Sequence, residues 1–318
     1  MLKYLIVQLD DTSVSFCHYG NGRTEPRLID LPTLKKALFW SMKENLTVQF
    51  ICPDYELPTE YKKLIESIDH AHIVASTCED EDLLKNADVV VFDIWGAINH
   101  YPFLTEQAYV IRTTFADLLD NGRFISAILD KVLRLNIVIV DVEKFDKDAE
   151  IKYAQFLDNL NEKIYQEYKK GHAVQVNLLT DRMLLDAMNN CGAGDESITL
   201  APDGKFYVCP GFYLDGSASV GDVDSGLNVK NAQLYRLDHA PICRICDAWQ
   251  CKRCVWQNKK STREVNTPGR EQCVIAHIER NASRKLLARI REIGTFLPDK
   301  EIAEIDYLDP FEKLKKRL

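Results

Sequence analysis

The chain has 318 residues, of which 46% are hydrophobic and 28% are charged, and its formal net charge is −8. This composition is ordinary for a globular protein, and the acidic balance gives no reason to expect nucleic acid or anionic membrane as a partner. The first residues, MLKYLIVQLDDT, lack a signal-peptide cleavage site, and no apolar run approaches the roughly 20 residues of a membrane span. We therefore expect a cytoplasmic protein whose cysteines are thiols or metal ligands rather than disulfides.

Strands and helices alternate through residues 4–179. Apolar runs predict strands at 4–9, 47–52, 71–76, 88–95, 108–112, 136–142 and 173–179. Apolar residues at helical spacing predict helices at 32–45, 59–68, 79–87, 115–134 and 146–170. This alternation indicates an α/β fold with a parallel sheet, either an open doubly wound sheet or an incomplete barrel.

The pattern changes after residue 190. The sequence SITLAPDGKFYVC (197–209) predicts a hairpin around Pro202-Asp203-Gly204. The stretch 240–270 has no apolar periodicity able to fold it, and a helix is predicted over 273–293. We therefore expect an α/β domain over 1–185, a second domain over 186–295 and a charged tail over 296–318.

Seven of the ten cysteines lie after residue 190. Two CxxC pairs, Cys243/Cys246 and Cys251/Cys254, are only four residues apart and have Arg, Lys and Gln as neighbours. The two thiolates of such a pair suit one metal centre, and a zinc ribbon usually separates its pairs by about 12–20 residues. The tight spacing favours iron–sulfur clusters, in which neighbouring cysteines bind different clusters. Zinc is the alternative.

Residues 191–273 resemble the SPASM domain, the C-terminal iron–sulfur domain of radical S-adenosylmethionine enzymes that modify peptides and proteins. Cys191, Gly204 and Cys209 fit the first part of its cysteine pattern. The run DGKFYVCPGF, which contains Gly204 and Cys209, and the later GDV (221–223) also resemble sequences of this family. The two close pairs and Cys273 fit the remainder.

This resemblance implies two 4Fe–4S clusters. One cluster is then bound by Cys243, Cys246, Cys251 and Cys273, and the other by Cys191, Cys209 and Cys254. The family often takes a fourth ligand from just upstream of the first cysteine, where this chain has MLLDAMNN. The second cluster therefore has an open iron, a ligand other than cysteine, or one of the distant thiols.

The front half lacks the motif that a radical S-adenosylmethionine enzyme needs after its first strand. That motif is CxxxCxxC, and here the loop DDTSVSFCHYGN contains only Cys17. The glycine-rich turn expected after the second strand reads CPDYELP (52–58) instead. The front half thus resembles a degenerate radical S-adenosylmethionine barrel, and it is uncertain whether the chain is itself an enzyme.

A chain with this layout resembles the CXXX repeat peptide maturase family. The resemblance implies a role in maturing a ribosomally made, cysteine-rich precursor peptide beside a radical S-adenosylmethionine enzyme that acts as a partner. Two alternatives stay open at this point: a zinc-stapled scaffold that binds a partner without chemistry, and an active radical enzyme with an unusual front site. No catalytic residue is assigned.

Other candidate side chains have a plainer interpretation. Asp10, Asp11, Asp93 and Asp141 follow predicted strands at the edge where α/β sheets place their sites, but capping and loop solvation are favoured. Cys17 is expected to be a half-buried loop thiol. Trp249 and Trp256 flank the last cysteine pair, and shielding of a cluster from water is their expected role.

Overall fold

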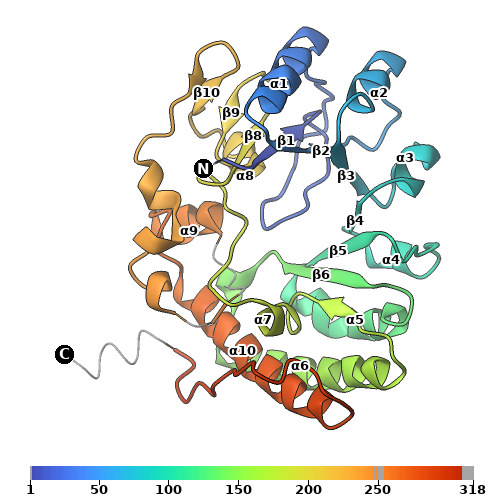
Figure 1. The fold of residues 1–318 in the computed structure, drawn as a ribbon, viewed down its shortest axis with the longest axis vertical. Helices are drawn as coiled ribbons and strands as arrows, with labels where there is room; N and C mark the ends of the chain where they lie inside the picture. Colours follow the sequence, from blue (N-terminus) through green and yellow to red (C-terminus); the bar gives the residue numbers. More distant parts are fainter. Residues whose placement is uncertain (1, 247, 250–253, 310–318) are drawn as a thin grey trace.

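The computed structural model describes residues 2–246, 248–249 and 254–309. Within these residues, nine strands form one sheet in the order β7-β6-β5-β4-β3-β2-β1-β8-β9 (Figure 1). Neighbours from β7 to β8 pair in parallel, and β9 pairs antiparallel to β8. The strands are β1 (Tyr4–Gln8), β2 (Thr47–Ile51), β3 (His70–Ala75), β4 (Val89–Phe92), β5 (Ala108–Thr113), β6 (Arg134–Ile139), β7 (Gln175–Val176), β8 (Ser197–Leu200) and β9 (Phe206–Tyr207).

The helices connect and cover these strands. They are α1 (Leu31–Lys43), α2 (Thr59–Ile65), α3 (Glu81–Lys85), α4 (Trp95–Ile98), α5 (Phe115–Ile128), α6 (Lys147–Lys169), α7 (Asp181–Leu184), α8 (Pro210–Leu214), α9 (Val255–Thr262) and α10 (Arg270–Arg291). A short antiparallel pair, β10 (Gly221–Asp222) and β11 (Gly226–Leu227), lies outside the main sheet. No helix in the described part of the chain is both long enough and apolar enough to cross a bilayer.

The strand order decides between the two predicted sheet types. A doubly wound sheet reverses its order at one point, whereas β1 to β7 follow one another in sequence across this sheet. From β1 to β7 each next strand is reached through a helix outside the curved sheet in Figure 1, and β8 and β9 extend the sheet beyond β1, so the sheet is an incomplete barrel with its edges at β7 and β9. The predicted α/β, barrel-like parallel sheet is confirmed.

The two faces of the sheet are covered by different parts of the chain. Side chains such as Val7, Phe50 and Val90 belong to the large core shared with the helices, which lie outside the curved sheet in Figure 1. The inner face has its own small apolar cluster. Val14 and Phe16, from the loop after β1, pack against that inner cluster. Helices therefore bury one face, and the first loop covers the other.

The cysteine-rich region is built onto the front region along two lines of contact. Strand β8 pairs in parallel with β1, which places the predicted 197–209 hairpin in the main sheet as β8 and β9. Helix α10 packs along α6, and its Ile275, Ile278 and Leu286 join the large core. The proposed division at residue 185 thus separates regions that share a sheet and a core.

A buried ion pair lies between these regions. The Arg182 guanidinium donates to Glu279 at 2.6 Å, and the Tyr153 hydroxyl donates to the same carboxylate at 2.6 Å. The side chains of Arg182 and Glu279 are only 2% and 0% exposed. Burial and the neighbouring Glu279 raise the pKa of Tyr153 well above its usual value, so the tyrosine stays a proton donor.

Several element boundaries differ from the sequence prediction for local reasons. The predicted strand 173–179 is reduced to β7 because the Thr180 hydroxyl bonds both the N–H and the C=O of Val176, turning the chain into α7. Helix α10 starts earlier than predicted because the Gln272 side chain accepts the N–H of Gly269 at 2.7 Å. Helices α4, α7, α8 and α9 were not predicted.

Replacing Glu279 with alanine should strongly destabilise the whole chain. The change leaves the Arg182 guanidinium buried without its carboxylate, which costs about 3–5 kcal/mol. Lys285→Ala is the matched control, because Lys285 lies on the same helix α10 and pairs with Asp158 of α6 at 2.8 Å, but this pair is exposed, and such pairs contribute about 0–1 kcal/mol. Thermal unfolding followed by circular dichroism should show a large drop for the first variant. Equal drops would contradict the assigned role of the buried pair.

Candidate functional site

Three of the predicted ligands line one cavity of about 360 Å³ at the junction of the two regions. Cys191 lies in the loop before β8, Cys209 directly precedes α8, and Cys254 directly precedes α9. A fourth thiol, that of Cys17, lines the same cavity from the loop after β1. The site thus draws cysteines from four separate segments.

The thiols of this cavity interact with one another. Contact with Cys17 is the largest cause of the raised pKa of Cys254, and burial adds to it. Burial also raises the pKa of Cys209, and the neighbouring Cys191 and Cys17 contribute in the same direction. Crowded thiols resist ionisation unless a positive charge is supplied nearby. A metal centre bound here would supply that charge and displace the thiol protons.

Two N–H donors beside these cysteines have no hydrogen-bond partner among the described residues. They are Nδ2 of Asn190 and Nε1 of Trp256, both buried as atoms, and both residues line the cavity. The Asn190 Oδ1 accepts the N–H of Gly192 at 2.9 Å, which orients the amide. A buried donor without a partner costs about 1–3 kcal/mol. Iron–sulfur clusters carry sulfides that accept such N–H groups, so the donors present fit that group.

The walls of the cavity pack too closely to admit a side chain at Gly211. A Cβ atom at this position would lie 2.9 Å from the Trp256 ring and 3.0 Å from the Cβ of Tyr19. Tyr19 is only 4% exposed, and its ring packs edge-on against Phe16. The segments that carry Cys17, Cys209 and Cys254 are therefore held in mutual contact by the residues next to those cysteines.

The other predicted ligand set is described in part. Cys243 begins the short helix Cys243–Ile245 and is 2% exposed, and Cys273 on α10 is 6% exposed. The Cys246 Sγ lies 3.8 Å from Nε2 of His277, which is one turn beyond Cys273 on the same helix. Cys246 therefore faces the α10 surface that carries Cys273. Cys251 lies outside the described residues.

Among residues 2–246, 248–249 and 254–309, no group of three or more His, Cys, Asp or Glu side chains is arranged to hold one metal ion. A four-iron cluster has a different requirement, because each thiolate binds a different iron and the sulfurs surround a cavity rather than one point. The ligand assignments for all seven cysteines remain predictions.

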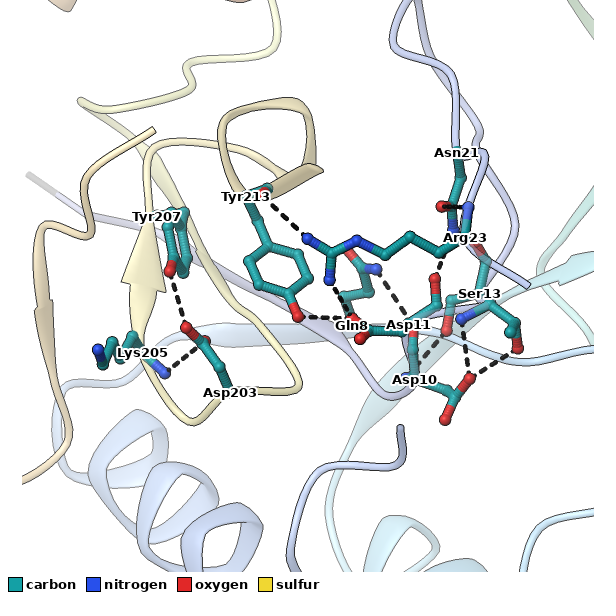
Figure 2. Close-up of polar contacts among 11 residues, drawn as sticks. Gln8, Asp10, Asp11, Ser13, Asn21, Arg23, Asp203, Lys205, Tyr207 and Tyr213 are labelled. Carbon is teal, nitrogen blue, oxygen red and sulfur yellow. Dashed lines mark hydrogen bonds and ion pairs between the residues drawn. The ribbon is translucent and has the colours of Figure 1, made fainter. Parts of the chain in front are cut away.

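A polar network links the first loop to the cysteine-rich region, as Figure 2 shows. The Asp11 carboxylate accepts from Arg23 at 2.6 Å and from the Tyr213 hydroxyl at 2.5 Å, and the Arg23 guanidinium lies 4.1 Å from the Tyr213 ring centre. Burial and the contact with Asp11 raise the pKa of Tyr213 to about 12, so it remains a donor at neutral pH. Nearby, the Thr12 N–H and the Tyr55 hydroxyl donate to Asp10.

The strand-end carboxylates all have structural partners. Besides Asp10 and Asp11, Asp93 accepts from Arg112 at 2.5 Å, and Asp141 accepts the N–H of Phe115 at the start of α5. Capping and loop organisation therefore account for them, in line with the plainer prediction. Of the two tryptophans, Trp256 lines the cysteine cavity, and Trp249 lies beneath Lys300, whose Nζ is 4.5 Å from the ring centre.

Solved structures of anSMEcpe share this fold. The histidine-tagged protein with bound AdoMet aligns with a TM-score of 0.62 at 14% sequence identity, covering 92% of this chain and 100% of that chain. The native protein with bound AdoMet and the Cp18Cys peptide gives the same values. SuiB from Streptococcus suis bound to S-adenosylmethionine covers 84% of this chain and 74% of that chain at 11% identity, and its TM-score of 0.44 is too low to establish a shared fold.

No protein-family profile matches the chain, and no curated protein matches it. The likeness to anSMEcpe therefore establishes the fold alone: a mixed α/β chain with a large, mostly parallel sheet. Among the four cysteines of the cavity, Cys17 is the one to which the sequence assigned no ligand role. Its loop is far from the other cysteines in sequence, and the only signal was that it is the one cysteine in the position of the missing motif.

Replacing Gly211 with alanine should disrupt the cavity. The added methyl group would overlap Trp256 and Tyr19, so the segments carrying the cysteines would have to separate. Gly22→Ala is the control, because a Cβ there meets no atom within 4 Å. Metal bound per chain, measured by elemental analysis after anaerobic purification, should fall for Gly211→Ala alone. Full metal content in both variants would show that the close packing is not needed.

Proposed function

We propose that this chain is a peptide-maturation protein that binds two 4Fe–4S clusters and acts with a radical S-adenosylmethionine enzyme on a cysteine-repeat peptide. One observation carries the proposal: three cysteines predicted to share a cluster converge, from segments far apart in sequence, on one cavity. The two unpartnered N–H groups of Asn190 and Trp256 on its wall support a sulfide-bearing group there.

The chain's own residues would position and shield these clusters. Bound clusters supply electron transfer, and cysteine thiolates hold them in fixed places. Trp256 and Tyr19 close the cavity on the side of α8, which limits the access of water. The ligands of one cluster are Cys191, Cys209 and Cys254, and those of the other are Cys243, Cys246, Cys251 and Cys273.

The front region would serve as a scaffold without its own radical chemistry. Its first loop contains a single cysteine, whereas three thiolates are needed to leave one iron of a cluster open for the cofactor. In addition, Val14 and Phe16 from this loop pack on the inner face of the sheet. The proposal of a partner enzyme follows, because the chemistry must then be started elsewhere.

The peptide partner is supported by the fold. In one structure of anSMEcpe, a chain of this fold, the Cp18Cys peptide is bound. The comparison supports a peptide as the substrate class, and the cysteine repeat rests on the sequence resemblance.

Iron and sulfide analysis of the anaerobically purified protein tests the clusters. We expect about eight irons and a similar number of sulfides per chain, and Cys243→Ala should lower both to about four. The variant should also expose residues 240–270 to protease, because the binding energy of a metal site in a segment without its own core is folding energy. Cys52→Ala, a core thiol, is the control and should keep the full content. Bound zinc without sulfide would instead favour the scaffold alternative.

An assay with AdoMet tests the proposal that the front region has no radical chemistry of its own. The iron-loaded protein, given AdoMet and a strong reductant, should form no 5′-deoxyadenosine, and a synthetic cysteine-repeat peptide added to it should keep its mass. The reason is that the first loop cannot supply three thiolates to a cofactor-binding cluster. Mass spectrometry of both products gives the measurement. Repeated turnover by the isolated protein would show that it is itself the radical enzyme.

A further inference from the structure

We propose that Cys17 is the fourth thiolate ligand of the cluster bound by Cys191, Cys209 and Cys254. The inference rests on the proposed function, since it assigns a ligand to one of the two proposed clusters. Of the three alternatives that the sequence left open for the fourth ligand, it selects a distant thiol.

The first argument is location. Cys17 lines the same cavity as the three predicted ligands. Along the sequence, most of the barrel lies between Cys17 and Cys191, the first of those ligands. Its thiol also interacts directly with that of Cys254. The two remaining front-half cysteines differ, because Cys52 and Cys78 belong to the large core shared with the helices.

The second argument is that the front region holds Cys17 in place through its neighbours. The Arg112 guanidinium, itself paired with Asp93, donates to the carbonyl of Cys17 at 2.8 Å and to that of Tyr19 at 2.6 Å. His18 Nδ1 lies 3.1 Å from the Ile139 carbonyl at the end of β6. A ligand whose backbone is fixed in this way loses little further entropy on binding, which favours a permanent ligand.

The third argument is the environment around the four thiols. Gly211 of α8 lies so close to Tyr19 and to Trp256 that a Cβ there would meet both, so α8, which follows Cys209, packs against the loop of Cys17 and against α9, which follows Cys254. The unpartnered N–H groups of Asn190 and Trp256 lie on the same cavity. A complete set of four thiolates with N–H donors around it is the composition of a fully ligated 4Fe–4S site.

The placement has a consequence for the architecture. In a radical S-adenosylmethionine enzyme the loop after the first strand carries the cysteines of the cofactor-binding cluster, and here the single cysteine of that loop would bind the cluster of the cysteine-rich region. The cluster would then join the barrel to that region by metal–thiolate bonds. Removing Cys17 should affect this one cluster and leave the other unchanged.

Spectroscopy of the anaerobically purified full chain tests the assignment. On mild oxidation, Cys17→Ala should lose one iron from this cluster, which leaves a three-iron cluster that is visible by EPR. The wild type should keep its full content of about eight irons under the same conditions. Cys17→Ser, which retains an oxygen ligand, should keep the full iron content with one altered iron site in its Mössbauer spectrum. Cys78→Ala is the matched control, since Cys78 is a buried front-half thiol in the large core, and it should behave as the wild type.

Chemical rescue separates ligation from a structural effect. Added 2-mercaptoethanol, with iron and sulfide, should restore the four-iron spectrum of Cys17→Ala, because a small thiolate can take the position of the missing side chain. Cys17→Ala and Cys17→Ser with the wild-type iron content and unaltered spectra would overturn the assignment while leaving the two clusters in place. A wild-type protein without iron and sulfide would overturn the proposed function, and this inference with it.

Discussion

A sheet that curls into part of a barrel has two apolar faces, and each needs its own cover. In this chain the helices take the outer face, and the inner face is covered by the loop after β1 through Val14 and Phe16. The burial of these side chains is favourable at about 25 cal/mol per Å² of apolar surface. Because Phe16 is next to Cys17, the packing that covers the inner face also fixes where that thiol lies. The cysteine cavity depends on this one loop.

The cysteine-rich region is joined to the barrel by three different kinds of interaction. Strand β8 continues the sheet beside β1, the Asp11–Arg23–Tyr213 network joins the first loop to α8, and the buried Arg182–Glu279 pair fixes α10. A buried charge pair of this kind is expensive to break and depends strongly on geometry. The cavity between the regions is therefore built from elements whose relative positions are set on several sides.

Much of the fold could be predicted from the sequence, because its strands are short apolar runs separated by amphipathic helices with clear ends. The hairpin at 197–209 was readable from its Pro-Asp-Gly turn, and the seven late cysteines were readable from their spacing. The pairing of β8 with β1 could not be predicted from the sequence, because strands that are distant in sequence leave no local pattern that identifies their partner. The sequence left a distant thiol open as a fourth ligand, but the place of Cys17 in the cavity was not predictable for the same reason. Helix α9 was missed because its polar residues give it only a weak apolar face.

The pairing of β1 with both β2 and β8 bears on when the protein can fold. Strand β1 is made well before β8, so one of its edges stays unpaired until Ser197–Leu200 have been made. The cavity can form only later still, because its lining includes Cys254 and Trp256 as well as Cys17. Contacts with such large sequence separation form slowly, and they leave strand edges exposed in the meantime. The nascent chain therefore carries an open sheet edge until β8 has been made, and the cavity that any metal centre would occupy is complete only after translation has passed residue 256.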